Sequence, residues 1–220
     1  MKTAVITGAN RGIGLALAEQ LQQKGWDIIA VCRTESEEIE NIASMVISGI
    51  DVTDQEQMHQ VKAIIGDQQI DLLINNAGLL RDEVLGEINY DTMREQFEIN
   101  ALAPLMVTET LLPNMVEGSK IANITSRMGS IADNDSGGRY GYRASKAAFN
   151  AIGKSLAEDL KTRGIAVAQL HPGWVKTRMV DFNGLITVEE SAQGLIERIE
   201  ELDLSTSGGF WHTNGEALPW

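Results

Sequence analysis

The sequence predicts a doubly wound α/β domain, in which a mostly parallel sheet carries helices on both faces. Short apolar or β-branched runs alternate with amphipathic or alanine-rich stretches along the chain, as in repeated βαβ units. A glycine-rich turn directly follows the first of these runs. The chain has 220 residues, of which 43 % are hydrophobic. This length suits one sizeable core and is short for two, so we expect a single domain over residues 1–220.

The expected strands are the short apolar runs, and the expected crossover helices are the segments between them. The first helix is the clearest, because Ile13, Leu17 and Leu21 recur every four residues and Gly25 is placed to end it. The glycine-rich segments 134–141 and 207–209 are expected to be loops. The predicted strands are Ala4–Thr7, Asp27–Cys32, Met45–Ile50, Ile70–Ile74, Lys120–Thr125 and Ile165–Leu170.

Composition argues against several kinds of partner. The formal net charge of −13 repels a phosphate backbone, and no run of Lys and Arg forms a basic stripe, so nucleic acid is not expected. No apolar stretch approaches the ~20 residues that cross a bilayer, and a strand-like run follows Met1 too closely for an export signal. We therefore expect a cytoplasmic protein.

Cys32 is the only cysteine, so neither a disulfide nor a metal site is expected.

The turn after the first strand has the residue pattern of a nucleotide site. Its glycines are spaced Gly-x3-Gly-x-Gly between the strand and the first helix. Glycine allows a pyrophosphate to approach the backbone closely, and the N-terminus of a helix stabilises its charge. A tight turn would also use glycine, but the position between strand and helix favours a dinucleotide. The candidate cofactor-binding residues of this turn are Gly8, Asn10, Arg11, Gly12, Ile13 and Gly14.

The residues after the second strand indicate which dinucleotide is bound. An NAD site usually places an acidic residue there, which holds the ribose 2′-hydroxyl. This chain instead has Cys32-Arg33-Thr34. The guanidinium of Arg33 suits a 2′-phosphate in charge and geometry, and Arg11 could reach the same group. NADP(H) is therefore the expected cofactor, and a solvated surface charge is the alternative role for either arginine.

Tyr142 and Lys146 are spaced to act together. They are four residues apart in a helix-like stretch that runs to about Leu160, so they share a helix face. A nearby ammonium lowers the pKa of a phenol, which would help Tyr142 exchange a proton with a carbonyl oxygen while hydride moves at the carbon. Tyr140 is the competing tyrosine, but Ala144 stands four residues after it, so Tyr140 lacks a lysine partner.

Ser126 is a candidate for the same site. It follows the predicted strand Lys120–Thr125, and open α/β sheets bind ligands at the carboxyl ends of their parallel strands. Its hydroxyl could hydrogen-bond a carbonyl oxygen on which charge develops. Ser130 and Ser136 in the following loop are alternatives.

Asn100 is a candidate because of a proline four residues after it. Pro104 has no N–H to donate to the carbonyl of Asn100, so a helix through this segment is expected to be interrupted. The free carbonyl could hold a water that passes protons between Lys146 and solvent. An ordinary proline kink is the alternative.

Together these residues resemble the short-chain dehydrogenase/reductase family over nearly the whole chain. The resemblance implies a Rossmann fold with a mostly parallel seven-stranded sheet, and a catalytic tetrad of Asn100, Ser126, Tyr142 and Lys146. Tyr142 and Lys146 would also contact the cofactor, with Lys146 at the nicotinamide ribose. The other cofactor-binding residues that the resemblance implies are Asp51 and Val52 at the adenine, Asn76, Ala77 and Gly78 beside the nucleotide, and Pro172, Gly173, Val175 and Thr177 at the nicotinamide.

Within this family, the segments 126–131, 135–138 and 218–220 are similar to the C-factor and carbonyl-reductase-like group. The expected function is interconversion of an aldehyde or ketone and an alcohol by NADP(H)-dependent hydride transfer. Because the group includes members linked to cell-to-cell signalling, the alternative is a nucleotide-binding signalling or sensor protein with little turnover. Relatives also imply a homodimer or homotetramer through the regions Met93–Met115 and Tyr142–Leu160, although some reductases of the family are monomers.

Two departures from the family pattern leave the substrate open beyond a small carbonyl or alcohol compound. The interval from Ser126 to Tyr142 is a few residues longer than the family norm, and the segment between Thr177 and Thr187 is short. In that short segment Met179, Phe182 and Leu185 could cap an apolar pocket, or could be ordinary packing residues.

Overall fold

The seven strands of the sheet all run parallel. In the computed structural model, which describes residues 1–220, their order is β3-β2-β1-β4-β5-β6-β7. The order reverses between β1 and β4, and ligands of such sheets bind in the crevice at the carboxyl ends of the strands beside that point. The strands are β1 (Thr3–Thr7), β2 (Asp27–Val31), β3 (Met45–Ile47), β4 (Ile70–Asn75), β5 (Met115–Ile124), β6 (Ala166–His171) and β7 (Phe210–His212).

Six of these strands lie at the predicted apolar runs. β5 begins at Met115 instead of Lys120, and β3 ends at Ile47 instead of Ile50. The edge strand β7 is absent from the predicted runs, because it has only three residues and follows the glycine-rich segment 207–209. A strand this short carries too little alternation to be recognised from sequence.

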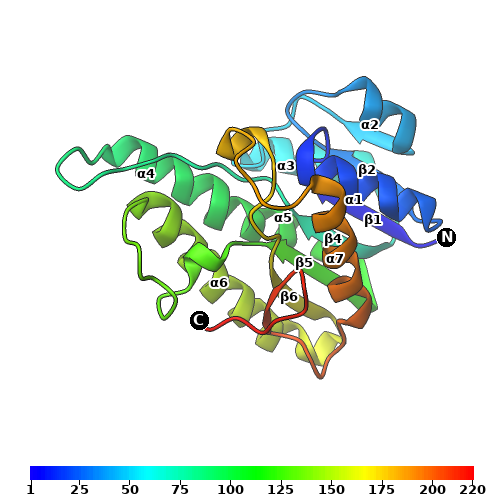
Figure 1. Cartoon of the computed structure of the whole chain (residues 1–220). Helices are drawn as coiled ribbons and strands as arrows, with labels where there is room; N and C mark the ends of the chain where they lie inside the picture. Colours follow the sequence, from blue (N-terminus) through cyan, green and yellow to red (C-terminus); the bar gives the residue numbers. More distant parts are fainter.

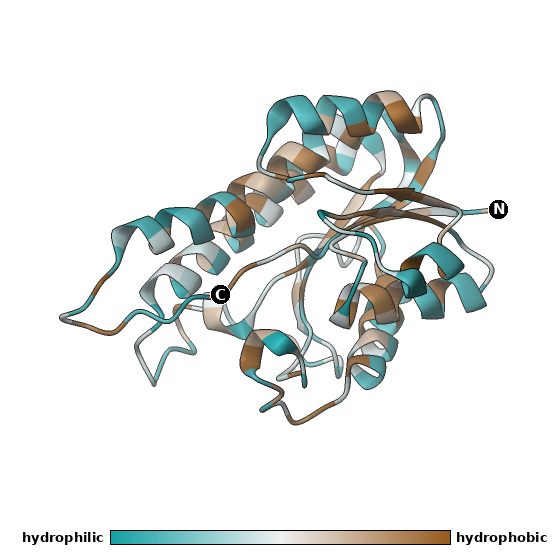
Figure 2. Cartoon of the chain, turned by 90° about the horizontal axis from the view of Figure 1, so that it is seen from above, coloured by the Kyte–Doolittle hydropathy of each residue, from teal (hydrophilic) through white to brown (hydrophobic).

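Helices cover both faces of the sheet (Figure 1). Alternate side chains of β1 point to opposite faces, so Ala4 and Ile6 belong to one hydrophobic cluster and Val5 belongs to a second. Figure 2 shows the hydrophobic residues gathered on the strands and on the adjoining helices. The first cluster contacts α1 (Gly12–Gln23), α2 (Glu37–Ile42) and α7 (Val188–Glu201), and the second contacts α3 (Gln55–Ile65), α5 (Ala103–Leu111) and α6 (Tyr140–Leu160).

The first helix, α1, follows the predicted pattern. Leu17 and Leu21 are buried and Ile13 is partly buried against the first cluster. Gly25 adopts φ +84° directly after the C-cap residue Lys24, the left-handed conformation that commonly ends a helix. None of the helices is long and apolar enough to cross a bilayer.

The helical segment around Pro104 is interrupted as predicted, and the interruption is a π-helical turn. Helix α4 (Tyr90–Phe97) continues into the turn η1 (Glu98–Leu102), and α5 begins at Ala103. The N–H of Ala103 donates to the carbonyl of Glu98, five residues earlier. Pro104 then occupies the first turn of α5, where a missing N–H costs little. Asn100 lies within the π-helical turn.

Candidate active site

The glycine-rich turn between β1 and α1 requires its glycines. Gly8 and Gly12 have φ of +67° and +55°, in the left-handed region that favours glycine. A Cβ on Gly14 would lie 2.3 Å from the carbonyl oxygen of Gly8, so that position tolerates no side chain. The first turn of α1 has no side-chain cap and no acidic residue. Its unpartnered N–H groups are therefore available to an anion.

Residues at the end of β4 hold this turn against β1. The Asn76 side-chain amide donates to the carbonyl oxygens of Thr7 and Gly8, at 3.0 and 3.1 Å. The hydroxyl of Thr7 accepts from the N–H groups of Asn76 and Ala77, at 3.0 and 3.1 Å. The predicted cofactor segment therefore supports the turn, and Thr7, which the sequence did not single out, joins the two strands. A Cβ on Gly78 would lie 3.8 Å from Lys146 Nζ, so this segment also borders the predicted catalytic residues.

The segment after β6 reaches the same turn. A Cβ on Gly12 would lie 3.8 Å from the Thr177 methyl group. The carbonyl of Pro172 accepts from Ser191 Oγ at 2.7 Å, and Gly173 adopts φ +87°. Val175 is buried and pairs with Ile186. Contact of these residues with a nicotinamide remains a prediction.

Arg33 and Asp51 lie after β2 and β3. Arg33 is exposed and belongs to none of the ion pairs, and the same is true of Arg11. Asp51 accepts hydrogen bonds from the N–H and hydroxyl of Thr53, at 3.0 and 2.7 Å. These bonds, followed by the charge of Arg33, lower the pKa of Asp51. Both arginines are free to contact a bound anion.

Tyr142 is the better placed of the two neighbouring tyrosines. It is 8 % exposed, whereas Tyr140 is 39 % exposed. Lys146 Nζ lies 5.9 Å from the centre of the Tyr142 ring and donates to the carbonyl of Ile124 at 3.0 Å. The spacing on α6 (Tyr140–Leu160) therefore brings the tyrosine and lysine together at the carboxyl end of β5, as predicted.

Ser126 is the best placed of the three candidate serines. Its hydroxyl accepts from Met128 N at 3.1 Å and lies close enough to the phenol of Tyr142 to lower the pKa of that phenol. The hydroxyl of Ser130 donates to the carbonyl of Trp220, and that of Ser136 accepts from Arg143. Of the three serines, Ser126 is therefore the one that acts on the phenol of the tyrosine.

The expected lowering of the Tyr142 pKa by Lys146 is wrong for this structure. Burial raises the pKa of Tyr142, and hydrogen bonding with Ser126 and the charge of Arg139 only partly oppose it. Burial also lowers the pKa of Lys146 to about 7, so much of its charge is lost at neutral pH. Sequence spacing shows that the two side chains are neighbours, but it does not show how strongly each is desolvated.

The side chain of Asn100 makes three hydrogen bonds. Its Oδ1 accepts from Leu79 N at 2.8 Å, and its Nδ2 donates to Leu79 O and Ser145 Oγ at 2.7 and 3.0 Å. The hydroxyl of Ser145 donates to the carbonyl of Tyr142 at 2.9 Å. Asn100 thus ties the π-helical turn to α6, an arrangement that the sequence did not show. The water relay through its carbonyl remains a prediction.

The apolar residues after Thr177 do not pack into the core. Met179, Phe182 and Leu185 are all exposed, so their alternative role as ordinary packing residues is wrong.

Near the same edge of the sheet, His171 and His212 lie in a T-shaped pair. Burial lowers the pKa of His171 to about 3, so this imidazole is neutral at pH 7.

Comparisons with known proteins agree with this geometry. Residues 2–184 match the family model described as short chain dehydrogenase. The chain is 39 % identical, over the full length of both proteins, to 1-hydroxy-2-glutathionyl-2-methyl-3-butene dehydrogenase of Rhodococcus sp. (strain AD45). It is 42 % identical to C-signal of Myxococcus xanthus over 69 % of this chain and 93 % of that protein. The solved structure of NADPH-bound carbonyl reductase from chicken fatty liver superposes with a TM-score of 0.89 at 29 % identity, covering 100 % of this chain and 99 % of that one.

Proposed function

Since the chain belongs to the short-chain dehydrogenase family of oxidoreductases, we propose that it is an NADP(H)-dependent enzyme that interconverts an aldehyde or ketone and the corresponding alcohol. One observation carries the proposal: buried Tyr142 lies beside Ser126 and Lys146. Tyr142 and Lys146 follow β5 in the chain, and Lys146 borders Gly78 at the end of β4. Proton-transferring groups therefore lie next to the turn that would hold a dinucleotide.

Tyr142 is the proposed general acid in reduction and general base in oxidation. The bound nicotinamide would supply or accept the hydride. Burial raises the pKa of Tyr142, so the phenol is protonated at neutral pH and has a proton to give to a carbonyl oxygen. Ser126 would hydrogen-bond that oxygen as negative charge develops on it. Lys146 would hold the nicotinamide ribose, and Asn100 would hold the turn beside them.

The glycine-rich turn and the two free arginines support NADP(H) as the cofactor. Gly8 and Gly12 give the turn its left-handed backbone, and Gly14 lets it pack closely. The uncapped first turn of α1 offers N–H donors to a pyrophosphate. Arg33 and Arg11 would bind the 2′-phosphate. The similarity to a carbonyl reductase solved with NADPH bound also favours this choice.

Consumption of NADPH with a panel of aldehydes and ketones tests the proposal. Replacing Tyr142 by Phe removes the proton donor and keeps the ring, so we expect kcat to fall by about 10²- to 10⁴-fold while NADPH binding is retained. Tyr140→Phe is the matched control and is expected to leave kcat unchanged.

A signalling or sensor protein is the second candidate, favoured by the similarity to C-signal. It would bind NADPH and use the same fold with little turnover. Absence of carbonyl reduction, together with unaltered biological activity in Tyr142→Phe, would support this candidate and contradict the enzyme.

Residues 1–220 are proposed to form a single domain, and this domain is proposed to assemble as a homodimer or homotetramer. Phe97 and Leu102 are apolar yet 40 % and 38 % exposed on the α4–α5 segment, which supports a contact there. Light scattering at several protein concentrations measures the oligomeric state, and a monomer at all of them contradicts this assembly.

A further inference from the structure

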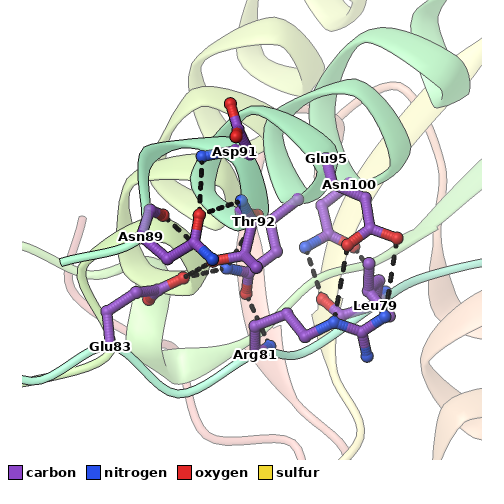
Figure 3. A network of polar contacts seen from close by, with 9 residues as sticks. Leu79, Arg81, Glu83, Asn89, Asp91, Thr92, Glu95 and Asn100 are labelled. Carbon is purple, nitrogen blue, oxygen red and sulfur yellow. Dashed lines mark hydrogen bonds and ion pairs between the residues drawn. The ribbon is translucent and has the colours of Figure 1, made fainter. Parts of the chain in front are cut away.

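The loop between β4 and α4 lies in extended form along that helix (Figure 3). The loop residues that form hydrogen bonds with the helical segment occur at every second position. Their partners occur at every fourth position of that segment, and the loop and the segment run in opposite directions. Two extended residues span about 6.6 Å and four helical residues about 6 Å, so the two spacings match and successive contacts form. These contacts join Leu79 to Asn100, Arg81 to Gln96 and Glu83 to Thr92.

Both ends of this set of contacts also bind α6. At one end the side-chain amide of Asn100 donates to Ser145 Oγ at 3.0 Å. At the other end the Glu83 carboxylate accepts from the N–H of Gly141 at 3.0 Å. Tyr142 lies between these two attachment points on the helix. The loop and α4 therefore hold α6 on either side of the proposed proton donor.

Glu83 accepts a hydrogen bond from the first turn of α6, which has no side-chain cap of its own. The N-cap residue Arg139 has φ +50°, and its side chain accepts no bond from the first turn. Glu83 supplies the acceptor from a position 58 residues earlier in the chain. A carboxylate at a helix N-terminus is also stabilised by the helix dipole.

Hydrogen-bond donors surround the buried side chain of Glu83. Glu83 is 3 % exposed and belongs to no ion pair. Three donors converge on it: Thr92 Oγ1 at 3.2 Å, Gln96 Nε2 at 2.5 Å and Gly141 N at 3.0 Å. A carboxylate accepts from all of them, whereas an amide at this position would turn an N–H₂ group towards a donor.

Gly141 shows how closely the carboxylate and the helix approach. A Cβ at this position would lie 2.5 Å from Gln96 Nε2 and 2.8 Å from Glu83 Oε1. Any larger residue would therefore push the first turn of α6 away from the loop.

We propose that Glu83 is a positioning residue for Tyr142: by capping the first turn of α6 it holds the phenol against Ser126. Tyr142 directly follows Gly141, so a displaced first turn moves the phenol. Lys146 stands one turn further on and has its own anchor on Ile124 O. The inference rests on the proposed function, in which Tyr142 is the proton donor.

Glu83→Gln compared with Thr92→Val tests the inference by kinetics. Glu83→Gln keeps the size of the side chain and disturbs the bond to Gly141, so kcat for carbonyl reduction should fall by about tenfold or more, because small misplacements of a reacting group are costly. KM for NADPH should change little. Thr92→Val removes another donor to the same carboxylate but leaves the Gly141 bond, so it should lower the melting temperature and keep kcat within about twofold.

A measurement without turnover separates this inference from the proposed function. The chain has 3 tyrosines, so Tyr142 is the only one left in a Tyr90→Phe/Tyr140→Phe background. The ¹³C chemical shift of its Cζ reports hydrogen bonding to the phenol, and Ser126→Ala supplies the value without the Ser126 bond. In Glu83→Gln we expect the signal to move about halfway or more towards that value, because the bond depends on the position of the helix turn. The signal should stay in place in Thr92→Val.

Several outcomes overturn the inference. An unmoved Tyr142 signal in folded Glu83→Gln does so, and so does a loss of kcat in Thr92→Val equal to that in Glu83→Gln. If Glu83→Gln does not fold, Gly141→Ala replaces it, and an unmoved signal in that variant is equally decisive. If the unsubstituted protein reduces no carbonyl compound, the proposed function fails, and the chemical shift still decides whether Glu83 positions Tyr142.

Discussion

Arg33 is an exposed guanidinium without an ion-pair partner, directly after β2. If it binds the 2′-phosphate, Arg33→Asp replaces an attraction by a repulsion. Because hydrogen bonds to charged groups contribute about 1.5–3 kcal/mol, we expect kcat/KM with NADPH to fall by about 10- to 100-fold and the ratio of NADH to NADPH activity to rise. Steady-state kinetics with both cofactors measure this change.

The control for that substitution is Arg94→Asp on α4. Arg94 is also exposed but pairs with Asp91, and it should not affect cofactor preference. Equal activity of the unsubstituted protein with NADPH and NADH would contradict the role of Arg33.

Lys146 should make the stability of the cofactor-free protein depend on pH. Burial lowers its pKa from 10.5 to about 7, so between these pH values the unfolded chain binds more protons than the folded one. Stability therefore rises with pH across this window, and below pH 7 the folded protein contains a buried charge. We expect Lys146→Met to raise the melting temperature near pH 6, and this gain to shrink as the pH approaches 10.

Thermal unfolding of the cofactor-free protein at several pH values checks this expectation. Lys154→Met is the control, because Lys154 is on the same helix but is half exposed and pairs with Glu158. A pH-independent difference between the unsubstituted protein and Lys146→Met would show that the lysine is solvated in the folded state.

At the scale of single elements, the close packing at the start of α1 makes Gly14 intolerant of substitution. A Cβ there would lie 2.3 Å from Gly8 O and 2.5 Å from Asn76 Nδ2. Neither the Gly8 carbonyl nor the Asn76 amide that donates to it can move without opening the turn. We expect Gly14→Ala to cost about 1–3 kcal/mol of stability, as overpacking does. NADPH affinity, measured by fluorescence titration, should fall by about tenfold or more, because the anion-binding N–H groups shift.

Gly25→Ala at the other end of α1 is the matched control. Gly25 has φ +84°, but no other atom lies within 4 Å of the position that an alanine Cβ would take. Alanine should therefore be strained there by about 1 kcal/mol without touching the cofactor turn. Unchanged NADPH affinity in both variants would contradict the assignment of the turn.

At the scale of the whole molecule, a row of buried amides crosses the sheet and reaches α6. Asn75 Nδ2 donates to Asn123 Oδ1 at 2.9 Å, and Asn123 Nδ2 donates to Gln169 Oε1 at 2.6 Å. Gln169 Nε2 then donates to the carbonyl of Phe149 at 2.8 Å. The three side chains come from β4, β5 and β6 and the last acceptor is a backbone carbonyl of α6, so the row joins the centre of the sheet to the helix that carries Tyr142.

Gln169→Leu should destabilise the protein although leucine is more apolar. It leaves Asn123 Nδ2 without its acceptor and removes the side-chain donor to the Phe149 carbonyl, and an unsatisfied buried group costs about 1–3 kcal/mol. Urea unfolding should show a loss of about 1–3 kcal/mol, whereas Gln193→Leu, at an exposed position on α7, should have little effect. A loss equally small in both variants would show that the row is not needed for stability.

The sequence by itself determined the parallel sheet and the main polar groups of the candidate site. Apolar runs, the glycine spacing after β1, and the four-residue interval from Tyr142 to Lys146 report local backbone geometry, which depends on residues close in the chain. Pro104 likewise indicated a helix interruption next to Asn100, because a missing N–H acts locally.

Tertiary structure alone decided the features that depend on distant partners. β7 forms because β6 pairs with it, although its three residues carry no clear pattern. The bond from Gly141 to Glu83 joins residues 58 apart. The pKa of Tyr142 rises instead of falling because burial outweighs the opposing effects of Ser126 and Arg139. Desolvation and capping are set by what packs against a residue, and spacing along the chain does not encode that environment.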